Sequence, residues 1–469
     1  MAWFTDSGYA LGRLLFQRGL AALYLVAFLV AAHQFRALIG ERGLLPVPRF
    51  TARVPFRDSP SVFHLHYTDR FFALWSWSGA ALSAALLAGV GDLVPLWASI
   101  LLWAALWVLY LSIVNVGQTW YAFGWESLLL ETGFLAVFLG NDEVAPPVLV
   151  LWLLRWLLFR VEFGAGMIKM RGDSCWRDLT ALYYHHETQP MPGPLSWFFH
   201  HLPRPLHRIE TAANHVAQLV LPFLLFTPQP VATWAAAALV ATQLWLVLSG
   251  NFAWLNWLTI LLALSVVQLP GIYERRLPDA PLWFTVLVCA AAALIAVLSW
   301  RPARNLLSSH QRMNASFDPL HLVNTYGAFG SVTRVRQEVV LEGTTDEVVT
   351  PTTEWREYGF KGKPTALKRL PRQFAPYHLR LDWLMWFAAL SPSYAAQWFP
   401  GFVAKLLEND PALLRLLRDN PFPDTPPARI RARLYTYEFT DWTELRAGAG
   451  WWKRRLIGDY LRPVSRRDL

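Results

Sequence analysis

Residues 281–300 read PLWFTVLVCAAAALIAVLSW, a run without a single Asp, Glu, Lys or Arg. A helix of about 20 apolar residues is long enough to cross the hydrocarbon core of a bilayer. Similar apolar runs recur throughout the preceding part of the chain. They lie at residues 14–33, 71–90, 93–113, 126–140, 148–168, 212–227, 231–249 and 253–269. The sequence therefore predicts about eight or nine membrane-spanning helices, of which the fourth and sixth are short.

The composition agrees with a membrane protein. Hydrophobic residues make up 54% of the 469 residues and charged residues only 16%, whereas soluble domains carry about a quarter charged residues. Many of the 25 tryptophans lie near the ends of apolar runs, where their rings suit the lipid headgroup region. The net charge of +9 comes without a basic block interleaved with aromatics, so we expect membrane lipids as partners and no nucleic acid.

The chain divides into a hydrophobic and a polar part. We expect residues 1–300 to form an all-α polytopic membrane domain with polar loops at 34–70 and 169–210. Residues 301–469 are expected to form a C-terminal α+β soluble domain. Alternating patterns predict strands at 332–342, 354–360 and 430–439, and helical periodicity appears at 381–390 and 403–418.

Charged residues interrupt the fifth apolar run at regular spacing. Arg155, Glu162 and Lys169 are seven residues apart, so they share one face of a helix. Each costs roughly 3 kcal/mol at the centre of a bilayer unless it is paired or hydrated. Glu131, in the preceding run, is expected to meet Arg155 or Arg160. These charges form either a buried polar track below a functional site or an ion-paired stripe that holds helices together.

A histidine-rich loop follows Lys169. His185, His186 and Glu187 are, with Lys169, the candidate catalytic residues, and an ordered hydrogen-bonded loop is the alternative. Adjacent histidines tend to point in different directions, and the i, i+4 pair of zinc hydrolases is missing, so no metal site is predicted. We expect the segment from His185 to His201 to hold Lys169 over a polar cavity.

The loop also carries a family resemblance. Residues 161–203 read VEFGAGMIKMRGDSCWRDLTALYYHHETQPMPGPLSWFFHHLP, which resembles the signature stretch of lipase maturation factors. The likeness extends from about Tyr121 to Tyr460. It includes SGNF at 249–252, NTYGAFG at 324–330, WREYGFKG at 355–362, YHLRLDWLMWFAAL at 377–390 and NPFP at 420–423.

This resemblance implies a membrane-embedded chaperone or maturation factor that helps secreted clients such as lipases to fold or assemble. It places the chain in the endoplasmic reticulum membrane of a eukaryote or the inner membrane of a bacterium. The C-terminal domain would face the lumen or periplasm. The basic segments 34–70 and 169–210 would by themselves favour the cytoplasmic side, but long loops and domains cross largely regardless of charge.

A folding factor needs exposed apolar side chains with which to contact incompletely packed clients. Aromatic residues in the loop and the tail are the candidates for this contact, and packing in the core is the alternative for each. They are Trp197, Phe198, Tyr377, Trp383 and Trp386.

A second, shorter resemblance suggests an enzyme instead. AGMIKM at 165–170, followed by Trp176, is similar to a span end in the vitamin K-dependent carboxylase superfamily, which implies Lys169 as a catalytic base. The substrate would then be lipid-soluble or a protein. No cofactor is identified, and a quinone-like or lipid ligand stays open. The chain has no Gly-x-Ser-x-Gly motif, so we do not expect it to be a lipase itself.

Overall fold

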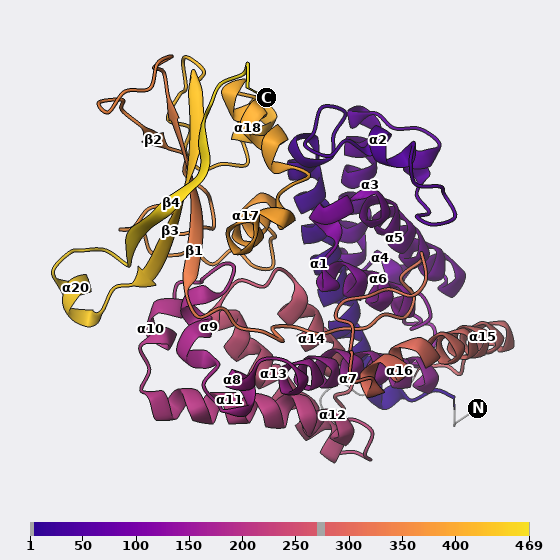
Figure 1. The fold of residues 1–469 in the computed structure, drawn as a ribbon. Helices are drawn as coiled ribbons and strands as arrows, with labels where there is room; N and C mark the ends of the chain where they lie inside the picture. The colour runs from indigo at the N-terminus through magenta and orange to yellow at the C-terminus, as the bar shows by residue number, and fades with distance from the viewer. Residues whose placement is uncertain (1–3, 270–276, 469) are drawn as a thin grey trace.

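The computed structural model describes residues 4–269 and 277–468, and it joins a helical N-terminal part to a C-terminal part with helices and a sheet (Figure 1). Every predicted apolar run contains a helix, although the runs at 126–140, 212–227 and 253–269 are helical only in part. The longer helices are α1 (Ala10–Leu38), α3 (Asp69–Ala88), α5 (Leu96–Val116), α6 (Gly124–Ala136), α7 (Val148–Arg171), α11 (Arg204–Leu219), α13 (Val231–Ser249), α14 (Leu255–Leu264) and α15 (Leu282–Leu298). The short ones are α2 (Val47–Thr51), α4 (Val90–Leu93), α8 (Ser174–Arg177), α9 (Leu182–Thr188), α10 (Ser196–His200), α12 (Leu221–Leu224) and α16 (Trp300–Leu307).

Fewer helices meet the requirements for a membrane span than the sequence predicted. Among the described residues, five helical segments are long and apolar enough to cross a membrane: Ser7–Leu38, Asp69–Ala88, Leu96–Val116, Val231–Ser249 and Leu282–Leu307. The other predicted spans do not meet these requirements, and each has a physical reason. Helices α6 and α14 have only 13 and 10 residues, α7 carries several buried charges, and the run at 212–227 is broken where α11 ends and α12 begins.

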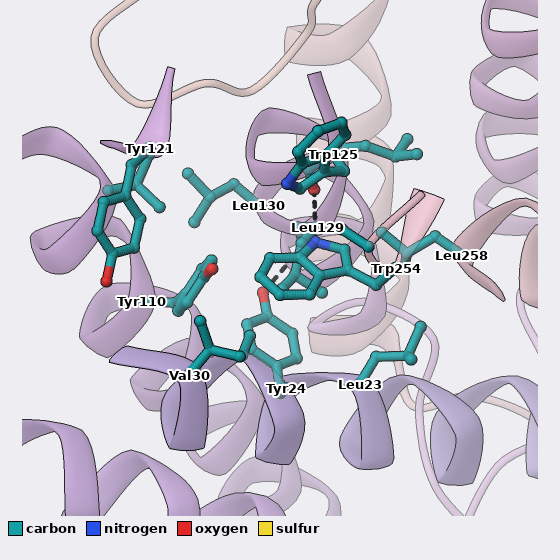
Figure 2. Close-up of a cluster of buried hydrophobic side chains, with 14 of the residues drawn as sticks. Leu23, Tyr24, Val30, Tyr110, Tyr121, Trp125, Leu129, Leu130, Trp254 and Leu258 are labelled. Atoms are coloured by element: carbon teal, nitrogen blue, oxygen red, sulfur yellow. Dashed lines mark hydrogen bonds between the residues drawn. The ribbon is translucent and has the colours of Figure 1, made fainter. Parts of the chain in front are cut away.

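The N-terminal helices pack around aromatic side chains (Figure 2). The Tyr24 hydroxyl donates to the Leu129 carbonyl at 3.0 Å, and the Trp254 indole donates to the Trp125 carbonyl at 2.9 Å. These polar tips are thus satisfied inside an apolar core, where an unpaired hydroxyl or indole N–H would be costly.

The C-terminal part contains the predicted helices and strands. Its strands are β1 (Arg336–Thr344), β2 (Arg356–Glu357), β3 (Arg429–Phe439) and β4 (Trp452–Val464), and its helices are α17 (Arg380–Leu390), α18 (Phe399–Leu407), α19 (Pro411–Leu414) and α20 (Trp442–Arg446). The strands form one antiparallel sheet in the order β2-β1-β3-β4. The single helix predicted over 403–418 is interrupted, because Asn409 takes a left-handed conformation with φ of 50°.

The edge strand β4 was not predicted. Its sequence WKRRLIGDYLRPV does not alternate between polar and apolar residues, and most of its side chains are exposed or half-buried. A strand without a buried face does not need apolar residues at every second position, so its sequence shows no alternation.

A buried ion pair joins the C-terminal part to the membrane helices. Arg380, at the start of α17, pairs with Glu126 of α6 at 2.7 Å, and both side chains are almost fully buried. The Tyr110 hydroxyl donates to the same carboxylate, and the Arg380 guanidinium lies 3.5 Å from the centre of the Tyr121 ring. Helix α17 lies between the sheet and α1 (Figure 1), so this contact is at the centre of the junction.

A second junction ties the sheet to the histidine-rich loop. Arg336 of β1 pairs with Glu338 at 2.6 Å and donates to the Glu187 carbonyl at 3.0 Å. The Trp197 indole of α10 donates to the Thr440 carbonyl, just after β3, at 2.8 Å. The C-terminal domain is therefore docked on the loop and does not hang from a free tether.

We predict that Glu126→Gln destabilises the whole protein. The substitution leaves the Arg380 cation buried without its counter-charge, which typically costs about 3–5 kcal/mol. Denaturant unfolding of the detergent-purified chain measures the change. The control is Glu354→Gln, because Glu354 pairs with Arg356 at 3.1 Å on an exposed surface, where about 1 kcal/mol or less is expected. Equal effects of the two substitutions would contradict the role given to the buried pair.

Candidate functional site

Lys169 lies in the last turn of α7 and is buried against α11. Its Nζ donates to Asn214 Oδ1 and Gln218 Oε1, both at 2.9 Å. The Trp176 ring centre lies 4.5 Å from the same nitrogen, within the range of a cation–π contact. The ammonium is therefore surrounded by two amide oxygens and an aromatic face.

A glycine allows α11 to come this close to α7. A Cβ atom on Gly166 would lie 2.6 Å from the side chain of Leu219 and 3.0 Å from Cβ of Gln218. Asn214 and Gln218 are four residues apart, so they share the helix face that this close approach presents to Lys169.

The partners of Lys169 correct one expectation. We expected the segment from His185 to His201 to hold the lysine, but its hydrogen-bond partners both come from α11. His185 instead packs edge-to-face on Phe329, with ring centres 4.7 Å apart. Burial lowers the pKa of His185 to about 3, so at neutral pH it is an uncharged ring close to the lysine.

Glu162 and Arg155 have neutral partners on other elements. Glu162 accepts from Gln243 Nε2 of α13 at 2.7 Å, and Gln243 Oε1 in turn accepts from Asn256 of α14 at 2.7 Å. Arg155 donates to the Tyr9 hydroxyl at 2.6 Å. The three regularly spaced charges of α7 thus anchor three different neighbours through hydrogen bonds.

Of the two partners expected for Glu131, Arg155 and Arg160, the structure pairs it with Arg160. Both side chains are 1% exposed. The same carboxylate accepts from the Tyr326 hydroxyl at 2.8 Å and from Asn324 Nδ2 at 3.0 Å. Asn324 and Tyr326 belong to the NTYGAFG motif, so Glu131 binds the start of the C-terminal part to the membrane helices.

The remaining loop candidates point to different places. Glu187 Oε1 accepts from the backbone N–H of Phe439 at 2.6 Å, and burial raises the pKa of its carboxyl to about 7. His186 points to α11, where it meets His207 and Glu210. Sequence reasoning did not single out the latter two, although their i, i+3 spacing on a helix is a recognisable signal.

The aromatic candidates separate into buried and exposed residues. Trp197 and Trp383 are buried, as the core-packing alternative describes, and the Trp386 indole donates to the Thr188 carbonyl at 3.0 Å. Tyr377 lines a cleft of about 560 Å³ between α1 and the C-terminal part. Phe198, 40% exposed, is the one of the five with a largely accessible ring.

Comparison with known proteins identifies the family. A family model described as the lipase maturation factor transmembrane domain matches residues 11–272, and one described as the lipase maturation factor C-terminal domain matches residues 322–462. Lipase maturation factor 1 of Bos taurus is 43% identical, over 98% of this chain and 90% of its own length. The Homo sapiens protein of that name is 41% identical (98% and 88%), and Homo sapiens lipase maturation factor 2 is 28% identical (98% and 84%). No solved structure matches the chain. With both of its parts matched and relatives similar over nearly their whole length, the chain belongs to the lipase maturation factor family.

Proposed function

We propose that this integral membrane protein assists the folding or assembly of secreted lipases. The observation that carries the proposal is the 43% identity to a lipase maturation factor over 98% of the chain. The buried Arg380–Glu126 pair supports it further, because a client would meet the membrane helices and the C-terminal domain as one surface.

An exposed aromatic patch supplies a contact surface for clients. Phe198 of α10 lies beside Trp442 of α20, with ring centres 6.1 Å apart, and Trp442 is 47% exposed. Leu195 adds a further exposed apolar side chain. A patch of this kind favours chains whose own apolar residues are not yet packed.

We also propose that the C-terminal domain faces the lumen or periplasm. The five apolar spans are an odd number, so they place the N-terminus and the C-terminal domain on opposite sides of the membrane. Helix α7 begins beside the N-terminal segment, where Pro147 pairs with Thr5, and its buried charges have partners within the protein.

A membrane enzyme with Lys169 as base is the second hypothesis. The burial of Lys169 favours it, because exclusion of water strengthens the electrostatic interactions between a catalytic group and its substrate. The contacts of Nζ favour the first hypothesis, since Nζ donates a hydrogen bond to each of the two amide oxygens and the lysine therefore serves as a donor. A donor that holds α7 to α11 and a base that removes a proton respond differently to substitution.

We predict that Lys169→Met abolishes lipase maturation while the chain still accumulates. Methionine keeps an unbranched stem against Trp176 but loses the hydrogen bonds to Asn214 and Gln218. The measurement is secreted lipase activity, relative to lipase protein, in cells that depend on this chain. We expect a loss of at least about tenfold, whereas Arg171→Ala on the same helix should have little effect.

Lys169→Arg separates the two hypotheses. Arginine stays protonated and donates hydrogen bonds, so a lysine that acts only as a donor tolerates the change in part, and a base does not. Full maturation by Lys169→Met would show that the site is not functional. Failure of that variant to accumulate would show that its role is structural.

We predict that a cysteine at Ser309, in the exposed turn after α16, reacts with a membrane-impermeant maleimide from the lumenal or periplasmic side only. The matched control is Pro278→Cys, exposed at the other end of α15, which should react from the cytoplasmic side. Replacing Cys289 removes the partly exposed native thiol, and Cys175 is buried. Labelling at Ser309→Cys from the cytoplasmic side would contradict the orientation.

A further inference from the structure

Two histidines and a glutamate meet between α9 and α11. His186 comes from α9, and His207 and Glu210 lie one turn apart on α11. One ligand atom of each side chain lies within 4.8 Å of the other two. His186 Nε2 lies 3.9 Å from Glu210 Oε2. Both histidines are at most 2% exposed, so the cluster is inside the protein.

Several side-chain atoms of the cluster lack hydrogen-bond partners, including one nitrogen or oxygen of each side chain that could bind an ion. Both ring nitrogens of His186, Nδ1 of His207 and Oε2 of Glu210 are buried and unpaired among the described residues. Burying such a group without a partner costs about 1–3 kcal/mol, so several unpaired groups in one place require an explanation. An ion pair between His186 and Glu210 would leave His207 Nδ1 unsatisfied.

In two of these side chains, the other polar atom already has a hydrogen-bond partner. His207 Nε2 donates to the His200 carbonyl at 3.2 Å, which leaves Nδ1 as the free nitrogen. Glu210 Oε1 accepts from the Trp245 indole at 2.7 Å, which leaves Oε2 directed at the histidines. Histidines that bind a metal almost always donate their other N–H to a carbonyl or carboxylate, and ligating carboxylates are themselves hydrogen-bonded.

We propose that His186, His207 and Glu210 bind one divalent metal ion of the zinc type. Two imidazole nitrogens and one carboxylate are a known zinc ligand set, in which water or another ligand takes the fourth position. At metal–ligand distances of about 2.1 Å the ligand atoms would be roughly 3.4 Å apart, so the side chains need to close by about 1 Å. The Glu210 side chain is 16% exposed, so the cluster lies near the protein surface.

The bound ion would join α9 and α11, which both make contacts with other parts of the fold. Helix α9 leads directly into the segment whose carbonyls receive the Arg336 guanidinium of β1. Helix α11 carries the amides that hold Lys169. A metal between α9 and α11 would therefore link the docked sheet to the lysine site.

The test uses the full chain, purified in detergent with an affinity tag that contains no histidine. Elemental analysis identifies and counts the metal retained by the protein. After removal of metal with a chelator, zinc and cobalt are titrated back, with cobalt absorption reporting the ligand geometry. We expect one ion per chain and tighter binding than for either ligand variant by at least about tenfold.

The ligand variants are His207→Gln and Glu210→Gln, and glutamine at 210 can still accept from Trp245. Trp245→Phe keeps all three ligands but removes their support, so it should weaken binding about 10- to 100-fold. His310→Gln, at an exposed histidine, is the control and should change nothing. Zinc or iron retained by the wild type and lost in the ligand variants supports the site. Absence of metal and of zinc binding in the wild type, or binding that the ligand variants leave intact, overturns it.

Discussion

A charge placed inside this protein must find a partner there, and this requirement determines how its two parts fit together. Arg380 comes from the C-terminal part and Glu126 from the membrane helices, and each would be strongly unfavourable if buried alone. Glu131 imposes the same constraint five residues further along α6, where it binds Arg160 and the NTYGAFG segment. Buried ions thus fix the orientation of the C-terminal part, because apolar packing alone tolerates small shifts that ion pairs do not.

Much of the architecture could be predicted from the sequence. The apolar runs predicted the helices, and alternating patterns rich in β-branched and aromatic residues predicted β1 and β3, although β1 is buried on both faces. The number of membrane spans could not be predicted in this way. Helices α6 and α14 are apolar because they are buried within the protein, and a buried helix and a spanning helix have the same composition. Strand β4 leaves no pattern at all, since neither of its faces is fully covered.

The candidate site, too, could be predicted from the sequence only in part. The position of Lys169 at the end of an apolar helix and its spacing from Glu162 could be predicted from the sequence. The sequence also predicted that Glu131 pairs with an arginine of α7, but not which of Arg155 and Arg160 it would be. The partners of the lysine could not be predicted, because Asn214 and Gln218 reach it only through the close approach that Gly166 permits. His186 likewise meets His207 and Glu210 through the fold of the loop, which turns adjacent histidines toward different neighbours.

We conclude that the membrane helices and the C-terminal domain form one folded body. A specific protease site inserted in the exposed turn at Ser308–His310 tests it directly, because cleavage there removes the covalent link and leaves the contacts. After cleavage in a mild detergent, size-exclusion chromatography should show both fragments eluting together, held by the buried pairs and the sheet–loop junction. Release of residues 311–469 as a separate soluble fragment would contradict the account.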